Sequence, residues 1–258
     1  SVSELYKLSI LYSHPEWIIG AYFDQLKDWG SVERLLEVNN IPVAPHIVVW
    51  PGKSTVEEIL ATGGTKLPFG EYSILSDHQP NEYPAVKDKR AGIQDMGSQL
   101  VAEIFAATLD ESAANWLDLC AGPGGKAALI NNILKVSAPE VSFTANEPTK
   151  HRAELVARVL PASQIISFDG RKFEDFPIKY DRILIDAPCS GLGALRRRPE
   201  ARWRRSLNDL KELIPLQRDL IDSAYQMLNP GGIIGFATCS PLLAETKAQI
   251  LDVKHRFK

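Results

Sequence analysis

The stretch Asp118-Leu119-Cys120-Ala121-Gly122-Pro123-Gly124-Gly125-Lys126 decides the fold of this chain. It follows an apolar run at 115–119 that predicts a strand, and it leads into a predicted helix at 124–134. Glycines are needed where backbone passes close to a ligand or adopts a positive φ, and the first turn of a helix presents free N–H groups. We therefore expect a strand, a ligand-binding loop and a helix in direct succession.

Outward from this stretch, strand-like and helix-like segments alternate from about residue 97 onward. Such alternation predicts an α/β fold with a Rossmann-like, mainly parallel, doubly wound sheet, in which ligands bind beyond the carboxyl ends of the strands. The predicted strands are 115–119, 141–146, 164–168, 182–186 and 232–237, and the predicted helices are 97–108, 124–134, 149–160 and 207–227.

The first part of the chain has a different pattern. Short strand-like runs at 47–50 and 72–75 mix with proline-punctuated segments, and helices are expected at 15–28, 31–39 and 54–61. This pattern suits a small α+β domain with a ferredoxin-like, RNA-recognition-type sheet. We expect a small RNA-binding domain at 1–90 and a catalytic domain at 91–258.

Acidic residues follow the first three predicted strands of the α/β part. Asp118 stands four residues before Gly122, as is usual in glycine-rich loops that bind S-adenosylmethionine, whereas Ala127 breaks the dinucleotide pattern G-x-G-x-x-G. Glu147 could accept hydrogen bonds from ribose hydroxyls and Asp169 from an adenine amino group; alone, each would be an ordinary polar residue at a strand end. The predicted cofactor site comprises Asp118, Cys120, Ala121, Gly122, Pro123, Gly124, Gly125, Lys126, Glu147, Arg152, Asp169, Gly170, Asp186 and Pro188.

Two cysteines follow the fourth and fifth predicted strands. A lone cysteine is usually a small buried hydrophobe, but Cys189 and Cys239 both lie at strand ends beside a candidate methyl-donor site. A thiolate that adds to carbon 6 of cytosine makes carbon 5 nucleophilic, and Asp186 could stabilise the adduct near ring nitrogen 3. Cys120 lies inside the cofactor loop, and we expect it to pack.

The motifs together resemble a known family. The stretch at 118–126, the run Asp186-Ala187-Pro188-Cys189-Ser190-Gly191 and the run Thr238-Cys239-Ser240 are similar to the Fmu/Sun family of RNA 5-methylcytosine methyltransferases. Gln94-Asp95-Met96-Gly97-Ser98 resembles the family's entry to the catalytic domain. Ser13-His14-Pro15-Glu16-Trp17 is similar to the bacterial ribosomal small-subunit methyltransferase B group. The resemblance covers nearly the whole chain.

This resemblance implies S-adenosylmethionine as cofactor, and RNA, in particular small-subunit ribosomal RNA, as substrate. It implies that Cys239 is the nucleophile, that Cys189 assists proton removal or product release, and that Lys126 and Asp186 line the pocket. DNA cytosine methyltransferases use their Pro-Cys thiol as nucleophile, so the order of the two thiols rests on the Thr-Cys motif.

The chain also departs from the family pattern. Ala127 stands where the family usually has Thr, and Met96-Gly97 replaces a more usual Glu-Ala. The chain ends about 19 residues after Cys239, where family members continue with two further strands. The group also has a helical NusB-like domain before its RNA-binding segment, and we expect this stretch of sequence not to include it. We therefore expect a catalytic domain that lacks its last strands.

A basic segment follows Cys189. Arginines bind phosphates and planar side chains stack on unpaired bases, although some arginines of such a segment could anchor the local fold or form a solvated helix face. The target base must be unpaired or flipped to reach the thiols. The predicted RNA contacts are Arg196, Arg197, Arg198, Arg202 and Trp203.

Composition narrows the remaining classes. The formal net charge is −3, and three dispersed cysteines argue against a disulfide framework or a structural zinc site, so we expect no metal. No apolar run is long enough for a membrane span, and we expect a cytoplasmic monomer. The alternatives are a DNA cytosine methyltransferase and a catalytically weakened RNA-binding or ribosome-assembly factor. A nicotinamide dehydrogenase is disfavoured by the incomplete glycine pattern and the two thiols.

Overall fold

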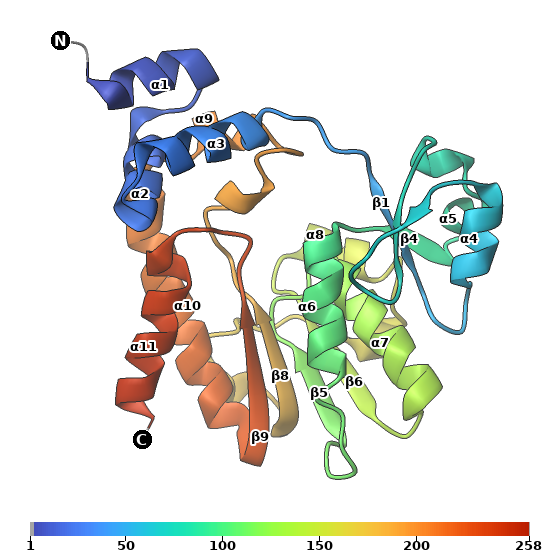
Figure 1. Cartoon of the computed structure of the whole chain (residues 1–258). Helices are drawn as coiled ribbons and strands as arrows, with labels where there is room; N and C mark the ends of the chain where they lie inside the picture. Colours follow the sequence, from blue (N-terminus) through green and yellow to red (C-terminus); the bar gives the residue numbers. More distant parts are fainter. Residues whose placement is uncertain (1–2, 258) are drawn as a thin grey trace. The chain divides into compact units, whose positions relative to one another are not determined.

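The computed structural model describes residues 3–257, apart from the side chain of His255, and divides into two compact units (Figure 1). Unit 1 consists of residues 3–43, 187–221 and 238–257, and unit 2 of residues 44–186 and 222–237. These limits, which are set by contacts, differ from the predicted boundary at residue 90. The reason is that residues 3–43 pack with later segments of the chain.

Unit 2 contains a parallel five-stranded sheet in the order β7-β6-β5-β8-β9. The chain runs from the central strand β5 outward through β6 to β7, then crosses to the other side for β8 and β9. This confirms the predicted α/β fold, and it puts the reversal of strand order between β5 and β8, where such sheets bind ligands. The strands are β5 (Asn115–Asp118), β6 (Ser142–Asn146), β7 (Ile165–Ile166), β8 (Tyr180–Asp186) and β9 (Leu228–Ala237).

Helices of unit 2 follow the strands in the expected alternation. Helix α7 begins directly after the glycine-rich loop, and Gly124 adopts a positive φ of 106° at its N-terminus. The Asp95 carboxylate caps α6 by accepting a hydrogen bond from Gly97 N. The helices are α6 (Met96–Ala106), α7 (Gly125–Ser137), α8 (Lys150–Val156) and α10 (Leu207–Met227), of which only the last turns of α10 belong to this unit.

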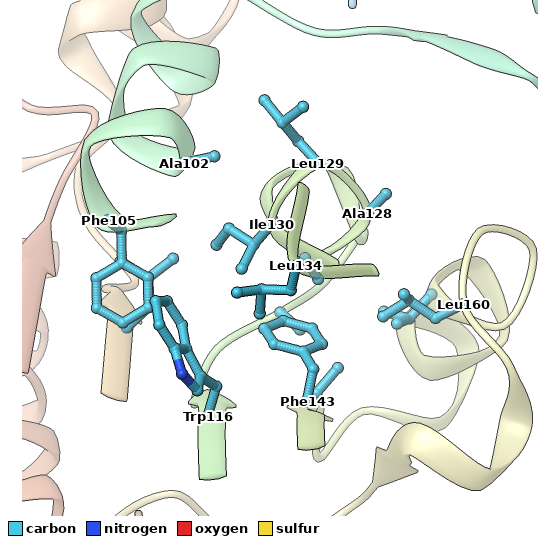
Figure 2. Packing of buried hydrophobic residues seen from close by; sticks show 14 of the residues in the cluster. Ala102, Phe105, Trp116, Ala128, Leu129, Ile130, Leu134, Phe143 and Leu160 are labelled. Carbon is cyan, nitrogen blue, oxygen red and sulfur yellow. The ribbon is translucent and has the colours of Figure 1, made fainter. Parts of the chain in front are cut away.

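A buried apolar cluster holds α6 and α7 against the sheet (Figure 2). The rings of Phe105 and Trp116 meet edge to face at 5.1 Å, and Trp116 Nε1 donates to Ala113 O. Ile130 and Leu134 of α7 lie in the same cluster. Burying each such side chain stabilises the fold by about 1.5–3 kcal/mol. The start of α7, and with it the glycine-rich loop, is therefore fixed at the end of β5.

Unit 2 also contains a second, antiparallel sheet in the order β2-β3-β1-β4. Its elements follow each other as strand, helix, strand, strand, helix, strand, which is the ferredoxin-like arrangement expected from the sequence. Ile47, Ile74 and Tyr83 are buried in its core. The elements are β1 (His46–Val49), α4 (Val56–Thr62), β2 (Thr65–Lys66), β3 (Ser73–Leu75), α5 (Pro84–Lys87) and β4 (Ala91–Ile93).

Unit 1 is helical. Its core joins Ile18 and Leu36 of the first helices to Leu192, Leu195 and Leu242 of the two later segments. No helix within residues 3–257 is long and apolar enough to cross a membrane. The helices are α1 (Glu4–Tyr12), α2 (Glu16–Leu26), α3 (Trp29–Asn39), α9 (Ala201–Arg204), α11 (Lys247–Arg256) and most of α10.

Candidate active site

Each unit contains its own group of candidate site residues. In unit 2, the predicted cofactor residues lie at the carboxyl ends of β5, β6, β7 and β8. In unit 1, Cys189 and Cys239 lie in the turns that follow β8 and β9 in the sequence. The parallel pairing of β8 with β9 matches Asp186 to Ala237, so the two cysteine-bearing segments leave the sheet from neighbouring strand ends.

Asp118 ends β5 and is buried. Its Oδ1 accepts a hydrogen bond from Cys120 N at 3.3 Å, whereas its Oδ2 has no hydrogen-bond partner among the described residues. Burial, reinforced by the nearby Asp186 carboxylate, raises the pKa of Asp118 to about 7, although Lys126 opposes this shift. A buried carboxylate oxygen without a donor is a place where a ligand ammonium or N–H group would be stabilised.

Lys126 and Asp186 form an ion pair with 2.7 Å between Lys126 Nζ and Asp186 Oδ2. Lys126 comes from the first turn of α7 and Asp186 from the end of β8, so the pair bridges the reversal of strand order. The sequence had assigned both residues to the site, and the structure brings them together. The same neighbourhood raises the pKa of the Cys120 thiol, chiefly through burial, which agrees with a packing role for Cys120.

Glu147 follows β6, and its side chain lies against the glycine-rich loop at Gly122. Its Oε1 accepts from Thr149 N, and its Oε2 lies 3.4 Å from Arg152 Nε. Arg152 in turn donates to Gly122 O. A Cβ on Gly122 would lie 2.1 Å from Glu147 Oε2, so a larger residue there would displace the Glu147 carboxylate.

Asp169 and Gly170 follow β7. The Asp169 carboxylate is paired with Arg171, with 2.6 Å between Asp169 Oδ2 and Arg171 Nη2, and this guanidinium lowers the pKa of Asp169 to about 2. Asp169 therefore remains ionised and able to accept further hydrogen bonds, while Gly170 is buried beside it. Its assignment to the adenine remains a prediction.

Asn146 is a site residue that the sequence analysis missed. It is fully buried at the end of β6, and its amide donates to Leu119 O at 3.0 Å and to Phe168 O at 3.1 Å. Its Oδ1 accepts from Phe168 N at 2.8 Å. The Asn146 side chain thus connects the loops after β5 and β7. β7 is shorter than predicted, and near Phe168 the hydrogen bonds to Asn146 stand in place of pairing between strands. A buried polar residue at a strand end was the available signal.

Cys189 and Cys239 lie side by side in unit 1, with their Sγ atoms 3.4 Å apart. Both are free thiols; Cys239 is exposed and Cys189 is half-buried. The contact with Cys239 and, next, burial raise the pKa of Cys189 well above its usual range. Either sulfur can donate in this contact, and the raised pKa favours Cys189 as the donor.

A buried polar network surrounds the thiol pair, and the sequence analysis did not predict it. Its centre is the fully buried Glu245, which accepts hydrogen bonds from Ser190 and Gln217. Gln217 also donates to Pro188 O at 2.9 Å, so Pro188 is held through its carbonyl in unit 1. The repeated Cys-Ser pair at 189–190 and 239–240 was the sequence signal for it.

The basic segment divides into a buried and an exposed part. Arg202 is buried, and its Nη1 donates to Asn40 Oδ1 at 2.8 Å and to Ser13 O at 3.1 Å. These groups bind the guanidinium through its Nη atoms, which indicates a structural role for Arg202, and its RNA contact remains a prediction. Arg196, Arg197, Arg198 and Trp203 are exposed, and Arg196 also donates to Ile41 O.

Comparison with known proteins places this architecture in a family. Residues 106–257 match the family described as 16S rRNA methyltransferase RsmB/F. The Mycobacterium tuberculosis protein Rv1407 is 43% identical over 96% of this chain and 55% of its own length. The ribosomal RNA small subunit methyltransferase B of Vibrio cholerae is 33% identical over 93% of this chain and 56% of its own length. The chain thus spans about half the length of these relatives.

Solved structures show the same fold. A methyltransferase homologue from Pyrococcus horikoshii superposes with a TM-score of 0.80 over 100% of this chain and 84% of that protein, at 19% identity. NSun6 from Pyrococcus horikoshii, solved with SFG, gives a TM-score of 0.76 over 91% of this chain and 86% of that protein, at 16% identity. From the family match and the relatives above 30% identity, the chain belongs to the 16S rRNA methyltransferase RsmB/F family.

Proposed function

We propose that this chain binds S-adenosylmethionine and methylates carbon 5 of a cytosine in RNA through a covalent bond between Cys239 Sγ and carbon 6. The observation that carries the proposal is the pair of free thiols, Cys189 and Cys239, with their sulfurs 3.4 Å apart. Family membership and the relatives named for ribosomal RNA small-subunit methylation support ribosomal RNA as the substrate class.

Cofactor binding would use the strand ends of unit 2. The unpartnered Asp118 Oδ2 suits the ligand's ammonium, and Glu147 suits its ribose hydroxyls. Gly122 leaves the room that a side chain would fill. When bound there, S-adenosylmethionine supplies an electrophilic methyl group.

The thiols would act in sequence on the base. The Cys239 thiolate forms a bond to carbon 6, which moves an electron pair to carbon 5 and makes that carbon the nucleophile for the methyl group. Ring nitrogen 3 would take up the proton that the Cys239 thiol releases on ionising and would give it up again when the adduct breaks down. Asp186 would accept a hydrogen bond from that N–H, and Lys126 orients the Asp186 carboxylate. The carbon 6–sulfur bond later breaks as carbon 5 loses its proton, which restores the Cys239 thiolate.

Cys189 would be the group that takes the carbon 5 proton. Its pKa is raised first of all by the hydrogen bond with Cys239. When the Cys239 sulfur is bound to carbon 6 it carries no negative charge, so this cause disappears and the pKa of Cys189 falls. Cys189 would thus ionise after the adduct has formed, when a base is needed.

The experiment that tests this function is covalent trapping. RNA containing 5-azacytidine should form a denaturation-resistant complex with the wild-type chain in the presence of S-adenosylmethionine. Cys239→Ser should abolish the complex, and Cys189→Ser should retain it, because release rather than attack is impaired. Trapping that survives Cys239→Ser but is lost in Cys189→Ser would reverse the two roles.

Two further arms separate the alternatives. Single-stranded DNA containing 5-azacytidine should not be trapped, and efficient trapping of DNA would favour a DNA cytosine methyltransferase. No complex with any cytosine substrate, together with RNA binding, would favour a non-catalytic assembly factor.

A further inference from the structure

Glu245 is a buried carboxylate for which the proposed chemistry has no direct use. Its side chain is fully enclosed in unit 1. Its Oε1 accepts from Ser190 N at 2.8 Å and from Gln217 Nε2 at 3.1 Å, and its Oε2 accepts from the Ser190 hydroxyl. All three donors are neutral. These hydrogen bonds are directional, so the Glu245 carboxylate holds the segments that donate them in fixed positions.

The partners of Glu245 connect both cysteine turns. Ser190 directly follows Cys189, Ser240 directly follows Cys239, and the two Oγ atoms lie 3.0 Å apart. A hydroxyl has one proton, and the ionised Glu245 can only accept, so the Ser190 proton points to Glu245. The Ser240 proton then points to Ser190 Oγ, while Ser240 Oγ accepts from Leu242 N at 3.1 Å. The carboxylate thereby orients both hydroxyls.

Three other hydrogen bonds lie around the same two cysteine turns. Gln217 Nε2 also donates to Pro188 O, one residue before Cys189, and Gln217 Oε1 accepts from Gln249 at 3.2 Å. Gly193 N donates to Cys239 O at 2.9 Å, and a Cβ on Gly193 would lie 2.9 Å from that oxygen. Cys189 is therefore bordered on both sides by backbone atoms that are bonded to the network, whereas Cys239 is held through its own carbonyl and through the hydroxyl of Ser240.

We propose that Glu245 is the positioning residue that sets the separation and relative orientation of the Cys189 and Cys239 thiols. This inference deepens the proposed function and rests on it, because the distance between the thiols matters only if they work as a pair. A small displacement of one turn would remove the sulfur–sulfur hydrogen bond, and misplacement by about 1 Å can cost on the order of a hundredfold in rate.

The test measures the thiols themselves. The rate of alkylation by iodoacetamide is measured for each cysteine at a series of pH values by peptide mass spectrometry. In the wild-type chain, the pH midpoints of the two rate profiles should be well separated between Cys239 and Cys189. Glu245→Gln keeps the size of the side chain but turns an amide N–H₂ toward donors. The midpoints should then converge, and alkylation of Cys239 at neutral pH should slow about tenfold because its thiolate loses a hydrogen bond.

A second readout reports distance directly. Diamide takes two electrons and two protons from a pair of thiols and leaves a disulfide. The wild-type chain should form the Cys189–Cys239 disulfide quickly, and Glu245→Gln should slow this on the order of a hundredfold. Glu212→Gln, an exposed glutamate on α10, is the matched control and should behave as wild type in both assays.

The outcomes decide between the alternatives. A folded Glu245→Gln with wild-type midpoints and a wild-type cross-linking rate would overturn the inference. If Glu245→Gln does not fold, Ser240→Ala serves as the second variant, because it removes one hydroxyl from the hydrogen-bonded series Ser240–Ser190–Glu245. The pH midpoints of alkylation of Cys189 and Cys239 should converge in this variant as well. Unchanged midpoints would contradict the inference. Neither assay needs RNA or S-adenosylmethionine, so converging midpoints without trapping by the wild type would refute the proposed reaction and not the positioning.

Discussion

Charged side chains have different kinds of partners in the two units. At the strand ends of unit 2, carboxylates form ion pairs: Asp186 pairs with Lys126, and Glu147 pairs with Arg152. In unit 1, the buried Glu245 is held by neutral hydroxyl and amide donors, and the buried Arg202 by backbone carbonyls and Asn40.

The difference matches what each region has to do. An ion pair at a strand end offers charged groups that a ligand can share or displace. A charge held by neutral, directional partners cannot be exchanged without leaving those partners unpaired, so it fixes segments that are distant in the sequence. Asp118 is the exception in unit 2, because its Oδ2 has no partner within residues 3–257.

The largest expected effect comes from removing the structural cation of unit 1. Arg202→Ala would remove the donor to Ser13 O and Asn40 Oδ1 and leave a cavity where the buried Arg202 side chain lies, and we expect a loss of about 3 kcal/mol in the free energy of unfolding. Urea unfolding would measure it. The neighbouring Arg198→Ala, at an exposed position, should change stability by less than about 0.5 kcal/mol. Equal losses from both substitutions would show that the segment is not divided as described.

The next effect concerns the unpartnered acid of unit 2. Because the folded-state pKa of Asp118, about 7, lies above its ordinary value, protonation stabilises the folded chain. That contribution is complete below about pH 4 and is lost as the pH rises through 7. Relative to wild type, Asp118→Asn should gain about 2.5 kcal/mol in stability between pH 5 and pH 8. Urea unfolding at the two pH values tests this, and parallel pH profiles would contradict it.

A residue of unit 1 should respond to pH in the opposite sense. His14 is fully buried, and burial lowers its pKa to about 4. The unfolded chain therefore binds the proton more tightly, so the contribution of His14 to stability is present above about pH 6.5 and is lost as the pH falls toward 4. His14→Gln should remove about 2 kcal/mol of the stability change between pH 7 and pH 5. A pH dependence that the substitution leaves intact would exclude His14 as its source.

The smallest effect should arise in the glycine-rich loop. Gly122→Ala would place a methyl group 2.1 Å from Glu147 Oε2 and displace that carboxylate from the loop. We expect S-adenosylmethionine affinity, measured by calorimetry, to fall about tenfold, since one oriented hydrogen-bonding group is lost. Gly30→Ala in α3 is the matched control, because its nearest neighbour would be 3.6 Å away. Unchanged affinity in Gly122→Ala would remove Glu147 from the site.

The sequence by itself determined the parallel sheet and the order of its parts. Alternating strand-like and helix-like segments and the glycine-rich loop at 118–126 predicted the fold. The acids at strand ends predicted the candidate site, to which both Lys126 and Asp186 were assigned. This was possible because strand period, glycine conformation and chain order are local properties.

Only the tertiary structure decided how the thiols are held and which arginine of the basic segment is buried. The contact between residues 3–43 and two segments more than 140 residues later depends on long-range burial, which no periodicity encodes. For the same reason Arg202 looked like its exposed neighbours, and Glu245 like any glutamate near the C-terminus. Whether a charged side chain is an anchor or a ligand contact depends on the donors and acceptors that folding brings around it.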